Sequence, residues 1–313
     1  MSDSRTIQKY AAASFLFVIL SAGLLSAQKI REGAANPGEK MVPNGDGTAV
    51  SAPMDEASPT GGAVVTGNGI NYNGGPVLQG NPVPIYVVFY GNWNGTGSNT
   101  PETTSLVELF LNNLGNTPYE KINSTYGDTT GNVSGNITLG GMIFDTGSQG
   151  TSLTNTKLSN IVTRSFSNGL PTDPNGLYVV ITASTVSEQG FCTQFSGFHT
   201  HQTLAGHDIK WAFVGNPDRC QNSCGLPGGP HGPAIDGLIN EITHVQEEAI
   251  SDPDLNAWFD SSGMENADKC SSNFGPTQSC GAGCQFNQTF GGQNWLIQEN
   301  WKNANGGACV QHL

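Results

Sequence analysis

The sequence predicts an α/β (α+β) protein with a mixed sheet in a single globular domain, and three features of the chain carry this prediction. Runs of β-branched and aromatic residues, typical of strands buried on both faces, alternate with segments in which apolar residues recur at helical spacing. One helical segment, near residues 234–251, is long and amphipathic. The chain beyond it is rich in Gly, Asn and Cys, which predicts an irregular C-terminal region bridged by disulfides.

The first 27 residues are predicted to be a signal peptide. Arg5 and Lys9 form a basic start, an apolar run spans residues 11–25, and Ser26-Ala27 offers a small-residue cleavage point. The apolar run is shorter than the roughly 20 residues that a membrane span needs, and no second apolar stretch follows it. We therefore expect a secreted, extracellular protein without a membrane span after cleavage; the alternative is a single N-terminal anchor.

Residues 28–66 are predicted to be a flexible leader or linker, because they are rich in Pro, Gly, Ser and Ala and lack apolar periodicity. This leaves residues 67–313 as the globular domain. The whole chain has a formal charge of −13, and only 12% of its residues are charged. An acidic surface repels phosphate backbones and anionic headgroups, so we expect neither nucleic acid nor a membrane surface as a partner. An extracellular polymer or peptide is the partner class that fits.

The domain is predicted to alternate strands with helices. The run at 85–90 is continuously β-branched and aromatic, which predicts a buried strand. The apolar spacing over 103–114 predicts a helix with Gly115 at its C-terminal cap. The same two patterns predict strands at 137–144, 177–182 and 210–214 and a helix at 153–166.

Seven cysteines fit an oxidising compartment. The simplest connectivity has two local bridges, Cys220–Cys224 and Cys280–Cys284, and a third between Cys270 and Cys309, so that Cys192 stays without a partner. A four-thiolate zinc site is the competing explanation, and it requires a reducing compartment or a buried cage.

The helix near 234–251 carries the one pattern in the chain that predicts a chemical site. On a helical wheel its apolar residues gather on one side, and His244 and Glu248 lie one turn apart on the opposite side. An imidazole and a carboxylate at this spacing are typical of a zinc-binding helix. Glu265 and Asp268 follow at a distance along the chain that is typical of a downstream carboxylate ligand. The alternative is an ordinary helix surface on which His and Glu meet by chance.

Val245 argues against catalysis at this site. In zinc peptidases with such a helix, the residue after the first histidine is a glutamate that takes a proton from the metal-bound water. Valine cannot accept a proton. Glu247 does not replace it, because two residues along a helix turn the side chain by about 200°.

The chain resembles the phosphate-induced, EXORDIUM-like family of extracellular proteins, best known from plants. The resemblance covers roughly residues 72–310 in order. The segments that carry it are Gly74-Gly75-Pro76-Val77-Leu78, Tyr90-Gly91-Asn92-Trp93, Ile137-Thr138-Leu139-Gly140-Gly141, Gly190-Phe191-Cys192, Gly197-Phe198-His199, Val214-Gly215-Asn216 with Cys220 and Cys224, Asp236 to Cys270, Asn287-Gln288 and Cys309.

Within this resemblance the chain departs from the family pattern at two positions. Many members have His-Glu-x-x-Glu where this chain has His244, Val245 and Glu248. Ser196 stands where the family usually has cysteine, which implies that Cys192 has lost its partner. His199 falls on the family pattern and is therefore a candidate extra ligand, although solvated histidines in a Gly-rich loop are the simpler explanation of His199 and its neighbour His201.

These observations predict a secreted, zincin-like protein, associated with the cell wall in the family it resembles. It would retain a zinc-binding helix without the catalytic glutamate and would act by binding rather than by hydrolysis. The predicted metal ligands are His244, Glu248, Glu265, Asp268 and His199, with no catalytic residue assigned. The alternatives are an active zinc metallopeptidase and a metal-free structural wall protein.

Overall fold

The computed structural model describes residues 31–32 and 67–313. The predicted signal peptide and most of the predicted leader lie outside the described residues. Within the leader, β1 (Arg31–Glu32) pairs with β8 (Gly197–Leu204) at one edge of the main sheet. Every helix in the described part of the chain is too short or too polar to cross a membrane.

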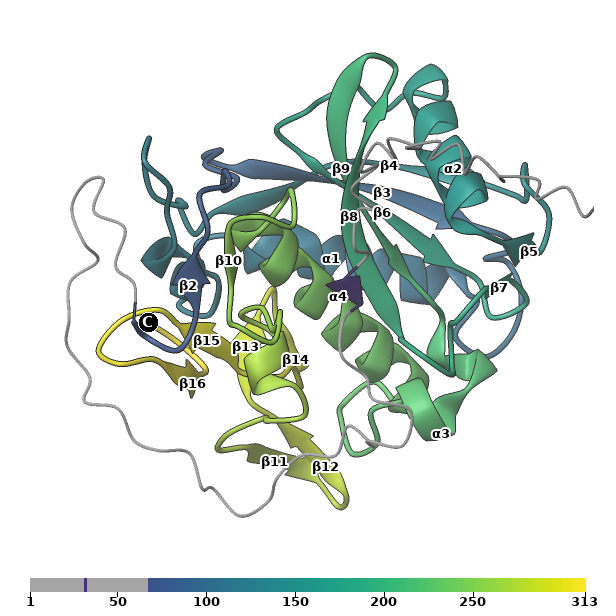
Figure 1. Ribbon diagram of the computed structural model, residues 1–313. Coiled ribbons are helices and arrows are strands. Elements are labelled where there is room, and N and C mark those ends of the chain that lie inside the picture. Colours follow the sequence, from purple (N-terminus) through teal and green to yellow (C-terminus); the bar gives the residue numbers. More distant parts are fainter. Residues whose placement is uncertain (1–30, 33–66) are drawn as a thin grey trace, which may run out of the picture.

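A mixed sheet forms the middle of the domain, with the strand order β1-β8-β9-β6-β3-β4 (Figure 1). Neighbouring strands from β9 to β4 are parallel, whereas β8 is antiparallel to β9. The predicted strands are confirmed, with these bounds: β3 (Val83–Tyr90), β4 (Ile137–Asp145), β6 (Leu177–Thr182) and β9 (His207–Val214).

The sequence prediction missed β8 and was wrong to place His199 and His201 in a solvated loop. Along this strand Thr200, His201, Gln202 and Thr203 interrupt the apolar pattern. All eight residues nevertheless pair with β9, and His199 is fully buried. Tertiary pairing, and not local apolar content, makes this segment a strand.

Helices cover both faces of the sheet (Figure 1). Val87 and Val179 point toward α1 (Pro101–Leu114) and α4 (Pro233–Ser251), whereas Val88 and Val180 point toward the face covered by α2 (Asn155–Ser167). All four valines are at most 1% exposed. This confirms that the central strands are buried on both faces, as their continuous apolar runs predicted.

Gly115 follows α1 as predicted, but for a different reason. Its φ is −55°, and the left-handed residue after the helix is Asn116, with φ 62°. A Cβ atom at position 115 would lie 2.0 Å from the carbonyl oxygen of Ile137. Glycine is therefore needed where the chain after α1 passes close to β4.

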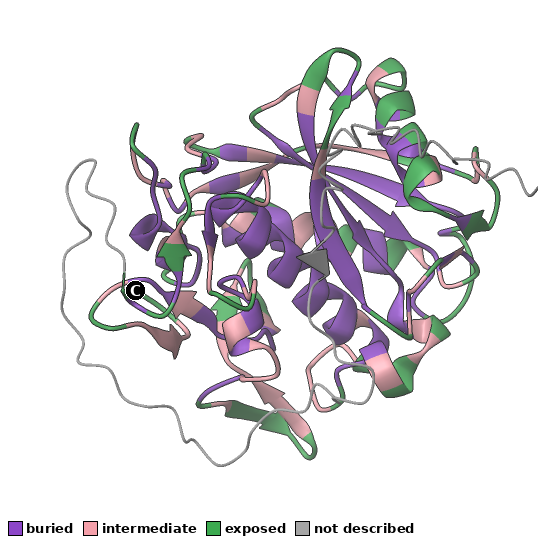
Figure 2. Ribbon diagram, viewed as in Figure 1, coloured by how far each residue is buried: buried purple, intermediate pink, exposed green. Residues whose placement is uncertain are grey.

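Helix α4 lies at the centre of the molecule and is buried around almost its whole circumference (Figure 2). One side packs on β8 and β9. Its polar side is covered by η1 (Glu120–Thr125) and by the chain after α4, so that His244, Glu247 and Glu248 are each at most 1% exposed. An amphipathic helix has thus become an interior helix with a buried polar face.

The C-terminal region is less irregular than predicted, because three short hairpins form in it. The remaining elements are β2 (Asn71–Tyr72), β5 (Ser152–Leu153), β7 (Ser187–Glu188), η2 (Pro217–Arg219), α3 (Gln221–Cys224), β10 (Trp258–Phe259), η3 (Asp268–Cys270) and the hairpins β11 (Gln278–Gly281)–β12 (Cys284–Phe286), β13 (Gln288–Phe290)–β14 (Gln293–Trp295) and β15 (Asn300–Lys302)–β16 (Ala308–Val310).

Two of the three predicted disulfides are confirmed, Cys270–Cys309 and Cys280–Cys284. The predicted Cys220–Cys224 bridge is wrong: Cys220 pairs with Cys192, and Cys224 is the free, buried cysteine. The reason is topological. Because β8 and β9 are antiparallel, the turn before β8, which holds Cys192, meets the chain after β9, which holds Cys220.

Burial of Glu299 gives the fold a pH dependence. The side chain is 2% exposed, and burial raises its pKa to about 7 from 4.5. Between these values the folded protein keeps a proton that the unfolded chain has lost, so the free energy of unfolding falls as pH rises from about 4.5 to about 7. Glutamine cannot ionise, so Glu299→Gln should lack this loss. Its free energy of unfolding, measured with urea, should fall by about 1–2 kcal/mol less than that of the wild type between pH 4.5 and pH 8. The same pH dependence in both proteins would show that Glu299 ionises normally.

Candidate metal centre

Three separate segments bring the five predicted metal ligands together. Helix α4 presents His244 and Glu248 one turn apart, with 3.0 Å between His244 Nε2 and Glu248 Oε1. The strand that the sequence analysis missed, β8, supplies His199. The loop after β10, leading into η3, supplies Glu265 and Asp268.

The separations between these atoms match those of ligands around a zinc ion. His199 Nε2 lies 3.3 Å from Glu265 Oε2, and His244 Nε2 lies 3.6 Å from Asp268 Oδ1. Tetrahedral zinc with bonds of about 2.0–2.1 Å places its ligand atoms about 3.3–3.4 Å apart. The five residues form two overlapping groups, His199–Glu248–Glu265 and His244–Glu248–Asp268, in each of which the ligand atoms lie within 4.8 Å of one another.

Glu248 belongs to both groups, and its surroundings fit a bound cation. The residue is 1% exposed, and neither carboxylate oxygen accepts a hydrogen bond of ordinary geometry from the described residues. A buried carboxylate without donors is costly unless a positive charge compensates it. The five side chains comprise three carboxylates and two imidazoles, a donor set that suits a divalent ion such as zinc.

The protonation states of the metal-free centre reflect the same crowding. Burial opposes protonation of His244, but the charge of Glu248 and a hydrogen bond with Asp268 outweigh it and raise the pKa of His244 well above its usual value. Burial raises the pKa of Glu248 to about 8, and the charge of Asp268 adds to this rise. Without a metal, protons would therefore compensate part of the negative charge.

Gln298 orients His244, and the sequence analysis missed it. Its Oε1 accepts from His244 Nδ1 at 3.1 Å, while its Nε2 donates to the carbonyl of Ala267 at 2.8 Å. A proton on Nδ1 leaves Nε2 of a neutral imidazole free to bind a metal, and such outer partners fix the ring of metal-binding histidines. Gln298 lies 54 residues from His244 in the sequence, and no motif marks it.

Val245, at the position where zinc peptidases have the catalytic glutamate, and the nearby Glu247 both lie outside the two ligand groups. Val245 is fully buried in the apolar cluster between α4 and the sheet. Glu247 belongs to a second buried polar cluster, where its Oε2 accepts a hydrogen bond from Asn300. Burial, and next the charge of Glu120, raise the pKa of Glu247 well above its usual value. No sequence motif marks η1 or the chain after η3, so local patterns do not predict this second cluster.

The centre is closed to solvent. His199 and Glu265 are 0% exposed, His244 and Glu248 are 1% exposed, and Asp268 is 7% exposed. Structural zinc sites are closed in this way, whereas catalytic ones keep a position open for water or substrate. The closed geometry therefore resembles that of a structural metal site more than that of a catalytic site, which a large substrate must reach.

A nearer-surface group, His201 with Asp208 and Asp254, is a weaker candidate for a metal. The ammonium of Lys210 already lies 2.9 Å from Asp208 Oδ2 and 3.4 Å from Asp254 Oδ1. This lysine supplies the positive charge that a metal would bring.

Comparison with known proteins identifies the family. The profile described as "Phosphate-induced protein 1 conserved region" matches residues 70–292. Protein EXORDIUM-like 5 from Arabidopsis thaliana is 30% identical over 285 residues, covering 77% of this chain and 77% of that protein. Protein EXORDIUM-like 3 from the same plant is 30% identical over 221 residues, covering 61% of this chain and 64% of that protein.

No solved structure matches the chain significantly. The family profile spans the main sheet from β3 to β9, the helix with His244 and Glu248 and the loop with Glu265 and Asp268. The chain therefore belongs to the phosphate-induced protein 1 family, together with the EXORDIUM-like proteins.

Proposed function

We propose that this protein is a secreted, non-catalytic member of the EXORDIUM-like family that binds a divalent metal ion, zinc by its donor set, in a structural centre. The observation that carries the proposal is the buried carboxylate of Glu248, which accepts no hydrogen bond of ordinary geometry from the described residues. It lies 3.0 Å from His244 Nε2 and belongs to both candidate ligand groups. A bound ion would join three elements distant in sequence, β8, α4 and the chain leading into η3.

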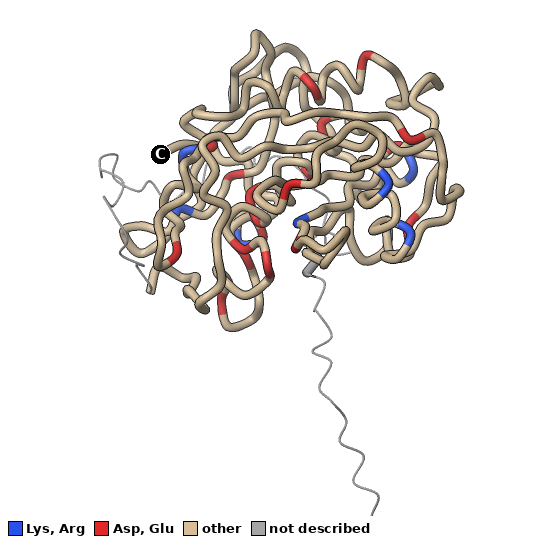
Figure 3. The backbone as a smooth tube through the Cα atoms, turned by 90° about the horizontal axis from the view of Figure 1, so that it is seen from above, with Lys and Arg blue, Asp and Glu red and all other residues tan. Residues whose placement is uncertain are grey.

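The similarity to zincins is then confined to the helix and its ligands. Val245 cannot act as a base, and the closed centre gives a polypeptide substrate no access. With hydrolysis excluded at the closed centre, we expect the protein to bind an extracellular polymer or peptide through its surface. Acidic residues are spread along the described chain with few Lys or Arg among them (Figure 3), which disfavours an anionic partner. Three disulfides support an oxidising compartment.

Metal analysis tests the proposal. Protein purified without chelator should contain zinc in stoichiometric amount, and His244→Ala should lose it. His207→Ala is the matched control, because His207 is exposed on the hairpin between β8 and β9 and should leave the zinc content unchanged. Absence of zinc and of other divalent metals from the wild type would refute the proposal and leave a metal-free structural protein. Retention of metal by His244→Ala would show that any bound ion is not held by this centre.

Zinc-loaded wild-type protein should hydrolyse a peptide library no faster than the same protein treated with chelator. Restoring a glutamate by Val245→Glu should not create activity, because position 245 faces the apolar core; the buried charge should instead lower the free energy of unfolding by about 3–4 kcal/mol. Peptide cleavage by the wild type that disappears on chelation and in His244→Ala would contradict the non-catalytic assignment.

A further inference from the structure

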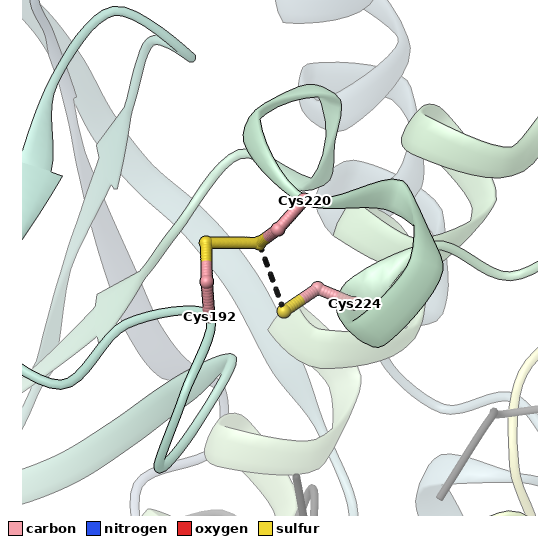
Figure 4. A group of neighbouring side chains, drawn as sticks. All are labelled: Cys192, Cys220 and Cys224. Carbon is pink, nitrogen blue, oxygen red and sulfur yellow. Dashed lines mark hydrogen bonds between the residues drawn. A yellow bond between two sulfur atoms is a disulfide. The ribbon is translucent and has the colours of Figure 1, made fainter. Parts of the chain in front are cut away.

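The sulfur atoms of three cysteines lie together (Figure 4), in a group that shares no residue with the candidate metal centre. Cys192 and Cys220 form a disulfide, and the free cysteine Cys224 has its sulfur 3.3 Å from Sγ of Cys220. This separation is shorter than the van der Waals contact of two sulfurs. A nucleophile is therefore already placed against a disulfide that it could attack.

The backbone also allows the alternative pairing. Cys220 directly precedes α3, and the amide of Cys224 donates to the carbonyl of Cys220 at 2.9 Å. One helical turn places side chains four residues apart on the same side, with Cβ atoms about 5–6 Å apart. A disulfide needs about 3.5–4.5 Å between Cβ atoms, so a small adjustment of this single turn is sufficient.

The two pairings differ in which thiol reaches solvent. Cys224 is 3% exposed and lies beside the hydroxyl of Ser196. Cys192 is half-buried, with φ 75°, in a turn where Thr193 and Gln194 are exposed. Transfer of the disulfide to Cys224 would leave the free thiol in this surface turn.

We propose that Cys192, Cys220 and Cys224 form a thiol–disulfide relay that makes Cys192 a site of modification by low-molecular-weight disulfides. The Cys224 thiolate attacks Sγ of Cys220; the Cys220–Cys224 bond forms, the Cys192–Cys220 bond breaks, and its electron pair leaves on the Cys192 sulfur. Cys224 releases its proton before the attack and Cys192 leaves as a thiolate, so the exchange needs no oxidant; the proton is taken up by the external thiolate released in the next step. The Cys192 thiolate then attacks an external disulfide, forming a mixed disulfide and releasing one external thiolate.

Burial sets the rate of this relay. It raises the pKa of the Cys224 thiol, and the charge of buried Glu241 adds to the rise, whereas Ser196 and Ser223 lower it through hydrogen bonds. Only a small fraction of Cys224 is then thiolate at neutral pH, so the exchange should be slow there and faster in alkaline solution.

The test is incubation of the folded, full-length protein with oxidised glutathione, followed by alkylation of free thiols, digestion and mass spectrometry. We expect glutathione on Cys192 together with a Cys220–Cys224 bridge. Cys224→Ser should carry about tenfold less glutathione on Cys192, because the Cys192–Cys220 bond then has no internal nucleophile. Circular dichroism confirms that each variant is folded.

Ser196→Cys provides a second variant that keeps all the native cysteines. Since position 196 lies beside Cys224, the new thiol should pair with it and likewise suppress modification of Cys192. Glutathione on Cys224 itself, no adduct on the wild type, or an equal adduct on Cys192 in Cys224→Ser would each overturn the relay. None of these outcomes depends on the metal centre.

Discussion

Glu248→Gln is expected to abolish zinc binding and, in the same protein, to stabilise the metal-free fold at neutral pH. Glu248 belongs to both groups of ligands, so its loss should remove the rise in melting temperature that zinc produces. That rise corresponds to about 2.7 kcal/mol at a zinc concentration of 100 Kd. Without zinc, the ionised carboxylate destabilises the folded protein, because burial raises its pKa to about 8.

The sign of the second effect follows from linkage. The folded-state pKa of Glu248 lies above the unfolded value, so its contribution to stability is present at low pH and is lost as pH rises toward 8. Glutamine cannot ionise, and we expect the chelated variant to gain about 1–3 kcal/mol at pH 8 over the chelated wild type.

Both effects are tested by the melting temperatures of the wild type and of Glu248→Gln, each measured with zinc and with chelator. Glu102→Gln, on the exposed start of α1, is the matched control and should follow the wild type in both conditions. If Glu248 were not a ligand, the variant and the wild type would respond to zinc alike. A zinc-dependent rise retained in Glu248→Gln would exclude Glu248 as a ligand.

Loss of the Cys270–Cys309 bridge should cause the largest loss of stability. Its sequence separation of 39 predicts about 4 kcal/mol from loop closure. The bridge begins at the end of η3, two residues after Asp268, so the double variant Cys270→Ser/Cys309→Ser should also weaken zinc binding. We expect a melting temperature lower by about 8–16 °C, measured by calorimetry, together with a higher Kd for zinc.

The bridge Cys280–Cys284 supplies the comparison. It closes a separation of 4 residues within the β11–β12 hairpin, which holds none of the candidate ligands, and its removal should cost only about 2 kcal/mol. Zinc affinity should not change. An equal effect of both double variants on zinc binding would mean that the Cys270–Cys309 bridge does not position Asp268.

Local patterns were sufficient for the apolar strands and for the amphipathic helix. The runs at 85–90 and 177–182 became β3 and β6, and the spacing around His244 predicted α4 to within a residue. These segments can be recognised because the periodicity of their apolar residues does not depend on which element packs against them. The strand β8 could not be recognised, since its polar residues are paired only through β9.

The sequence by itself determined the family, the central helix and the placing of His244 and Glu248 one turn apart on that helix, with Val245 after the histidine. Tertiary structure alone decided that His199 meets Glu265 and that Gln298 orients His244. It also decided that Cys192, and not Cys224, pairs with Cys220. The physical reason is the same in each case. Spacing along a helix fixes which side chains are neighbours within one element, whereas contacts between elements depend on strand order and direction, which no local pattern encodes.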